Sequence, residues 1–165
     1  MASDTIQFLT HGGSLTPYFD IAPGNSYVDA AAEAGYPAFS YDRLGTGRSD
    51  RPDPIQEVQA ALQVEIMHEL VQGLRTGTIG GHAYTNVAAV SHSLGCSLII
   101  GQASLYPEEF DAVVLSGTST SMDYIGAVLA GPAYGPASAD SRFKGFPHAY
   151  ILYVGQEALQ LIFFK

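Results

Sequence analysis

The 165-residue sequence is poor in cysteine and in basic residues. Its single cysteine, Cys96, cannot form an intrachain disulfide and cannot complete a metal site built from several thiolates. Seven lysines and arginines stand against 16 acidic residues and form no cluster. The basic surface that nucleic acid or anionic lipid would require is therefore missing, and we expect no nucleic-acid partner.

Long hydrophobic runs and export signals are also lacking. No window approaches the ~18 consecutive apolar residues of a membrane span. The N-terminus, MASDTIQFLT, has neither the basic nor the apolar region of a signal peptide. The sequence therefore predicts no membrane span and leaves the location in the cell open. With 47% hydrophobic and 14% charged residues, the composition favours one globular domain with a core.

Strand and helix patterns alternate along the first two thirds of the chain. Four segments have the composition of buried strands: 5–10, 37–42, 84–91 and 111–117. Helices are expected between them at 28–35, from Ile55 onward for roughly 20 residues, and at about 94–106. This order predicts an α/β fold in which a parallel sheet of about four strands is flanked by helices.

The C-terminal part has a different composition. It is rich in Gly, Ser, Ala and Pro, contains one short helical run at 125–130, and ends in the apolar LQLIFFK. Such an apolar end is typical of a segment that packs against further protein. We expect residues 1–120 to form the core and residues 121–165 to form a lid-like or cap-like segment, and the alternative for this segment is a linker.

The motif SHSLG at 91–95 stands where a predicted strand meets a predicted helix. A serine between two small residues in this context is typical of a nucleophile elbow, which holds the serine on a tight, strained turn. Gly95 meets the demand for a small residue fully and Ser91 meets it approximately. Ser93 is therefore the candidate nucleophile, and the alternative is an ordinary small-residue turn.

Two backbone N–H groups are candidates to stabilise an oxyanion beside that serine. Leu94 would begin the helix, where free N–H groups and the helix dipole favour negative charge. HGGS at 11–14 follows the first strand, and its glycines let the backbone approach a substrate, which makes Gly13 the second candidate donor. The alternative for 11–14 is an ordinary loop.

Together with YDRLGTGRSDRP at 41–52, these motifs resemble the α/β-hydrolase superfamily. They are similar to its serine esterases, lipases and peptidase-like enzymes with an HGG oxyanion loop, and the C-terminal segment loosely resembles the lid of some fungal members. The resemblance implies hydrolysis of an ester, amide or related acyl bond of a small molecule by Ser93, with oxyanion donors Gly13 and Leu94. It implies no cofactor and no metal.

The same resemblance implies that the chain is incomplete. The family fold typically has eight strands, and the four predicted here correspond to its third to sixth. The acid and histidine of the family's catalytic triad follow the last two strands. Substitutes within this sequence would be Asp123 and His148. The alternative function is therefore a truncated or degenerate family member without catalytic activity.

Other polar residues near these motifs are expected to have structural roles. We expect His11 and His92 to support their loops and Cys96 to pack in the core. We expect Asp42 and Arg43 to tie down their own glycine loop by an ion pair and hydrogen bonds.

Overall fold

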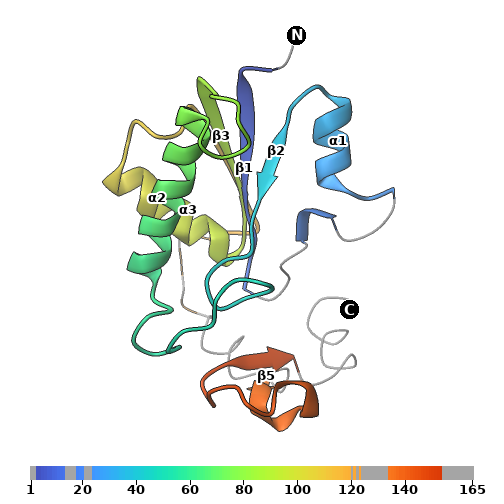
Figure 1. The fold of residues 1–165 in the computed structure, drawn as a ribbon, viewed down its shortest axis with the longest axis vertical. Coiled ribbons are helices and arrows are strands. Elements are labelled where there is room, and N and C mark those ends of the chain that lie inside the picture. Colours follow the sequence, from blue (N-terminus) through green and yellow to red (C-terminus); the bar gives the residue numbers. More distant parts are fainter. Residues whose placement is uncertain are drawn as a thin grey trace.

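A parallel four-stranded sheet lies between two layers of helix (Figure 1). The structure, a computed structural model, describes residues 3–13, 18–20, 24–119, 121, 123 and 134–153. The strands of this sheet are β1 (Thr5–Thr10), β2 (Ala38–Ser40), β3 (Asn86–His92) and β4 (Ala112–Ser116). They are arranged in the order β2-β1-β3-β4 and every pairing is parallel, which confirms the predicted α/β architecture.

Three α-helices connect these strands: α1 (Tyr27–Glu33), α2 (Ala60–Thr76) and α3 (Leu94–Leu105). α2 and α3 cover one face of the sheet and α1 lies on the other (Figure 1). α1 begins after Ser26, whose side chain accepts a hydrogen bond from the N–H of Asp29, and it is followed by Gly35 at φ 85°, as predicted. Among the helices of the described ranges, none is long and apolar enough to cross a membrane.

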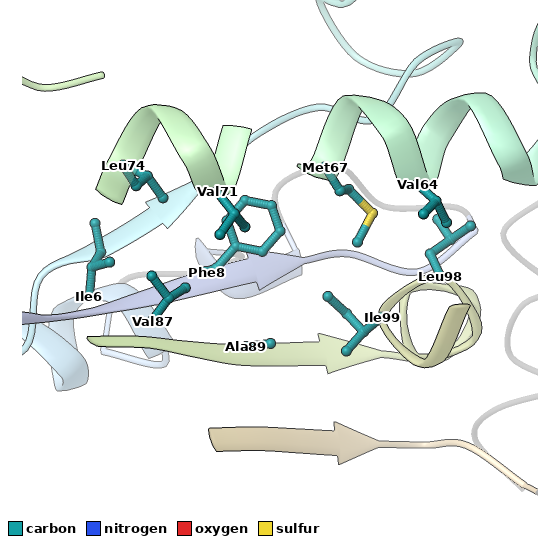
Figure 2. Close-up of a cluster of buried hydrophobic side chains, with 10 residues drawn as sticks. All are labelled: Ile6, Phe8, Val64, Met67, Val71, Leu74, Val87, Ala89, Leu98 and Ile99. Atoms are coloured by element: carbon teal, nitrogen blue, oxygen red, sulfur yellow. The ribbon is translucent and has the colours of Figure 1, made fainter. Parts of the chain in front are cut away.

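The core follows from the alternation of side chains along the central strands. On β1, Phe8 points toward α2 and α3, whereas Leu9 points toward α1. The ring of Phe8 stacks on Phe39 and Tyr41, with ring centroids 5.9 and 5.5 Å apart. Figure 2 shows the main cluster, which consists of Ile6, Phe8, Val64, Met67, Val71, Leu74, Val87, Ala89, Leu98 and Ile99.

The start of α2 differs from the prediction. The apolar spacing begins at Ile55, but Ile55 is 61% exposed and the helix begins at Ala60. A carboxylate oxygen of Asp53 accepts hydrogen bonds from the N–H groups of Ile55 and Gln56, both at 2.8 Å. This local turn takes up the backbone donors that the first turn of a helix would present, so the helix starts later.

β4 also differs from its prediction as a buried strand. All of its residues are exposed, and Val114 is 52% exposed. β4 pairs with β3 along one edge, and no strand of the described chain pairs with the other. The apolar composition of 111–117 makes burial favourable, but burial also needs an element that packs against the strand.

Residues 134–153 form a small unit of their own. It contains the antiparallel strands β5 (Tyr134–Pro136) and β6 (Ile151–Tyr153), joined by 3-10 turns at Ala137–Ala139 and Ser141–Phe143. The Tyr150 hydroxyl donates to the carbonyl of Pro52 (2.8 Å), and the Arg51 guanidinium lies 5.3 Å from the ring centroid of Phe146. The unit therefore contacts the loop after β2, below the sheet in Figure 1. The helix predicted at 125–130 lies outside the described residues.

Two adjacent isoleucines on α3 test the core. Ile99 is fully buried, whereas Ile100 is 48% exposed. We predict that Ile99→Ala lowers the free energy of unfolding by about 2–5 kcal/mol, because it leaves a cavity against the sheet. Ile100→Ala has the same effect on helix propensity and should cost about 0.5 kcal/mol or less. Urea unfolding of both variants measures the difference, and equal losses would contradict the assigned core.

Candidate active site

Ser93 stands between β3 and α3 in a backbone conformation that L-residues rarely adopt. Its φ is 51° and its ψ is −120°, and no other non-glycine residue of the described chain has a positive φ. Such a conformation costs about 1–3 kcal/mol, so its neighbours must impose it. The Ser93 N–H donates to the carbonyl of Ser116 (2.9 Å), and its own carbonyl accepts from the N–H of Cys96 (2.9 Å). These bonds hold an exposed serine at the carboxyl end of β3.

The small residues on either side of Ser93 have a steric cause. A Cβ atom on Gly95 would lie 2.4 Å from the carbonyl oxygen of Thr10 and 2.8 Å from that of His11. Ser91 is fully buried, and its hydroxyl donates to the carbonyl of Val114 (3.3 Å). The first turn of α3 is therefore pressed against the end of β1, and only glycine fits at position 95.

The glycine loop after β1 lies against the same turn. A Cβ atom on Gly12 would lie 3.1 Å from the Cβ of Ser93, whereas one on Gly13 would meet nothing within 4 Å. Gly13 is exposed, and Ser14 lies outside the described residues. Leu94 opens α3, so its N–H has no acceptor within the helix. The two segments that carry the predicted oxyanion donors thus meet at Ser93.

His11 supports this loop in one fixed tautomer. It is 1% exposed, and its Nε2 accepts a hydrogen bond from the N–H of Arg43 (3.0 Å). The proton must then be on Nδ1, which donates to the carbonyl of Gly12 (2.8 Å). Burial, with the positive charge of Arg43 added, lowers the pKa of His11 to about 4. His11 is therefore neutral at pH 7 and structural, as predicted.

The expected ion pair between Asp42 and Arg43 is not formed. The Asp42 carboxylate accepts from the N–H of Arg48 (2.8 Å), and the Asp42 carbonyl accepts from the Ser49 hydroxyl. Asp42 therefore ties down its own glycine loop, as expected. Successive side chains of an extended segment point to opposite sides, so Arg43 points away from this loop and into the protein.

Arg43 holds the HGG loop instead. It is 3% exposed, and its Nε donates to the carbonyl of His11 (3.2 Å). Its two terminal nitrogens donate to the carbonyl of Gly12 and to the side-chain oxygen of Gln63, both at 2.8 Å. Gln63 was missed by sequence reasoning. The signal was its position on α2, four residues before Met67 on the apolar face of the helix, where a polar side chain requires a buried partner.

The described residues supply no base to Ser93. Its hydroxyl makes no hydrogen bond within them. Nδ1 of His92 pairs with the Ser116 hydroxyl (3.0 Å), and burial lowers the pKa of His92. Asp123 is exposed and accepts from the Ser121 hydroxyl (2.6 Å), and His148 is exposed in the turn before β6. Asp123 and His148 are thus not brought into hydrogen-bond contact with Ser93.

The remaining predictions concern a metal and Cys96. No group of three or more His, Cys, Asp or Glu side chains that could hold a metal ion occurs in the ranges that the structure covers. Cys96 is fully buried, and its Sγ contacts the carbonyl of Ser116 at 3.3 Å, so it packs in the interior as expected. The observed site is a strained serine at a helix N-terminus, next to a glycine loop whose carbonyls are held by the buried side chain of Arg43.

The sequence matches the model of the α/β-hydrolase family over residues 8–163. This match covers most of the chain, and the chain belongs to the α/β-hydrolase family. No curated protein matches the sequence.

Solved structures agree with the family. An α/β hydrolase from Novosphingobium aromaticivorans has a TM-score of 0.56 at 17% identity, covering 79% of this chain and 42% of that one. The α/β hydrolase MGS-M2, from a Medee basin deep-sea metagenome library, has a TM-score of 0.54 at 17% identity, and the match covers 84% of this chain and 52% of that one. An extracellular α/β-hydrolase from a Paenibacillus species has a TM-score of 0.50 at 12% identity, and the match covers 77% of this chain and 51% of that one. These likenesses show the fold, and this chain spans about half the length of those proteins.

Two glycines of α3 test the steric cause of the elbow. We predict that Gly95→Ala destabilises the fold or displaces the turn at Ser93, because its methyl group would collide with the backbone of β1. At Gly101 the nearest atom to a new Cβ is 3.5 Å away, so Gly101→Ala should raise the free energy of unfolding by up to about 1 kcal/mol through helix propensity. Chemical unfolding compares the two. Equal tolerance of both substitutions would contradict the close approach.

The protonation of His11 gives a second test. We predict that His11 titrates with a pKa of about 4 in the folded protein, against 6.5 for a free histidine. Between these pH values the unfolded chain binds more protons, so the free energy of unfolding falls as the pH falls from 6.5 toward 4. NMR titration of the histidine ring protons measures the pKa directly. A His11 that titrates near 6.5 would refute its buried, neutral state.

Proposed function

We propose that this chain carries the nucleophile of a serine hydrolase that acts on an ester, amide or related acyl bond of a small molecule. The observation that carries the proposal is the conformation of Ser93, a non-glycine residue at φ 51° at the N-terminus of α3. Strain of this kind persists where the surrounding structure over-determines it, and it is concentrated at functional sites. Membership of the α/β-hydrolase family supports hydrolysis in general.

In the proposed reaction the Ser93 oxygen attacks the acyl carbon, and the carbonyl oxygen becomes an oxyanion. The N–H groups of Gly13 and Leu94 would stabilise that charge, which backbone donors fixed in advance do efficiently. The tetrahedral intermediate expels the leaving group, which takes up the proton lost by the Ser93 hydroxyl, and leaves an acyl ester on Ser93. Water then attacks this ester, releases the acid and restores the serine.

The lid assignment belongs to the same proposal. Residues 134–153 contact the loop after β2 through Tyr150 and Phe146, and because the sheet is parallel this loop lies at the same end of the sheet as the turn after β3. We assign residues 121–165 to a lid-like segment and residues 1–120 to the core. A segment at this position would limit which acyl substrates reach the serine.

A second candidate is a family member without turnover. One observation favours it: all five histidines of the sequence lie in the described ranges, and none of them forms a hydrogen bond with the Ser93 hydroxyl. Serine is a weak nucleophile without a base. In this case the site would bind a carbonyl compound without cleaving it.

Hydrolysis of a short-chain aryl ester separates the two candidates. We predict that Ser93→Ala lowers the rate by about 100-fold or more, as expected for loss of a nucleophile. Ser97→Ala is the matched control, because Ser97 is an exposed serine about one turn further along α3. A fluorophosphonate probe should label the wild-type chain on the peptide containing Ser93 and should not label that peptide in Ser93→Ala.

Two outcomes would contradict the assignment of Ser93 as the nucleophile. If wild type and Ser93→Ala hydrolyse the ester at the same rate and neither is labelled, the nucleophile assignment is wrong, and if that rate equals the rate without protein, the non-catalytic candidate holds. Activity that falls in Ser97→Ala as much as in Ser93→Ala would point to damage of α3 and would also overturn the assignment.

A further inference from the structure

Among the residues that the structure describes, the Arg43 guanidinium is a buried positive charge without a negative partner. It is 3% exposed, and within the described residues it forms no ion pair. Its side-chain partners are the carbonyls of His11 and Gly12 and the amide oxygen of Gln63. A buried charge is costly unless it is well hydrogen-bonded. The dipoles of these three groups must therefore offset the free-energy cost of burying the charge.

One of these dipoles belongs to the peptide unit that carries the proposed oxyanion donor. The carbonyl of Gly12 and the N–H of Gly13 lie in one planar peptide group, and in a trans peptide they point in opposite directions. The Gly12 oxygen accepts two hydrogen bonds, from Arg43 Nη2 and from His11 Nδ1, both at 2.8 Å. With its oxygen held by two donors, this peptide cannot rotate freely, and its N–H points away from Arg43.

Arg43 also changes the strength of that donor. A charged donor on a carbonyl oxygen polarises the peptide group, and hydrogen bonds in a chain strengthen one another. The N–H of Gly13 therefore carries more positive charge than the N–H of an ordinary loop glycine.

From this geometry we infer that Arg43 is a positioning residue for acyl transfer, which orients and polarises the Gly12–Gly13 peptide so that the Gly13 N–H can stabilise the oxyanion. The inference rests on the proposed function of Ser93. It assigns to Arg43 a role in the chemistry that reaches beyond its own loop, although Arg43 itself does not touch the substrate.

The neutrality of Gln63 is part of this arrangement. Gln63 is 8% exposed on α2 and fixes the guanidinium through a bond of 2.8 Å to Nη1. A glutamate at this position could accept the same bond, but its charge would cancel the positive charge behind the loop. An amide anchors the guanidinium and leaves its charge available to the Gly12 carbonyl.

Arg43→Lys tests the role, with Arg48→Lys as the matched control. A lysine keeps the positive charge, but its single ammonium group lacks the forked shape of the guanidinium and cannot donate to both carbonyls and to Gln63 at once. Arg48 lies on the same loop and is exposed. We expect Arg43→Lys to lower kcat by about 10- to 100-fold, with KM changed by less than about threefold, because the oxyanion develops only in the transition state. The Gly13 amide proton resonance should also move upfield in this variant. Arg48→Lys should leave all three quantities unchanged.

Gln63→Glu is the second variant, because it separates polarisation from folding. The new carboxylate would accept the bond from Arg43 and pair with its charge, so the unfolding midpoint should stay at or above that of wild type. We expect kcat to fall by about tenfold and the Gly13 amide resonance to move upfield, as in Arg43→Lys. A purely structural Arg43 predicts wild-type kcat in Gln63→Glu.

Two results would overturn the inference. The first is wild-type kcat together with an unmoved Gly13 resonance in a folded Arg43→Lys or Gln63→Glu variant. The second is a loss of kcat in Arg43→Lys that is matched by an equal rise in KM. If the wild-type chain hydrolyses no ester, the proposed function of Ser93 fails on its own, and the Gly13 resonance in the two variants alone decides whether Arg43 polarises this peptide.

Discussion

The close approach between the end of β1 and the first turn of α3 governs the arrangement of the site. The carbonyl of Thr10 lies so near Gly95 that no side chain fits at position 95. The same approach brings the backbone of Gly12 against Ser93, one residue before the helix begins. The serine and the glycine loop come from segments some 80 residues apart, and they meet because β1 and β3 are neighbours in the parallel sheet. Loosening this contact would separate the candidate nucleophile from the loop that carries its candidate oxyanion donor.

The packing of the hydrophobic core keeps Ser93 in its strained backbone conformation. A conformation that costs about 1–3 kcal/mol is small beside the burial of several large side chains, each of which contributes a similar amount. Phe8 on β1, Met67 on α2 and Ile99 on α3 are all fully buried and join these three elements in one core cluster. Because these contacts fix where β3 ends and α3 starts, the turn between them has little freedom to relax. The site therefore has its rigidity from a core that takes no part in the chemistry.

The sequence was sufficient for much of the fold, and it indicated two segments that meet at Ser93. Strand and helix periodicities, Gly35 and Gly95 are local signals, and the structure shows a positive φ at Gly35 and a close backbone contact at Gly95. The start of α2 was wrong because the apolar spacing at Ile55 continues through a turn that Asp53 caps. The predicted partner of Arg43, Asp42, was wrong, because two of the three groups that its side chain binds are backbone carbonyls, which any residue could supply. Backbone acceptors leave no signature in a sequence.

The exposure of β4 bears on the behaviour of the protein in concentrated solution. Its valines and leucine are accessible to solvent, and within the described chain its outer backbone groups face no neighbouring strand. An apolar sheet edge of this kind is a template on which another strand can form, whether it belongs to the same polypeptide or to a different molecule. α3, which connects β3 to β4, has no charged residue from Leu94 to Leu105, so it adds no charge that would oppose such contact. The nearest acidic residues, Glu108, Glu109 and Asp111, precede the strand, so β4 itself carries none of the net charge of −9 at pH 7.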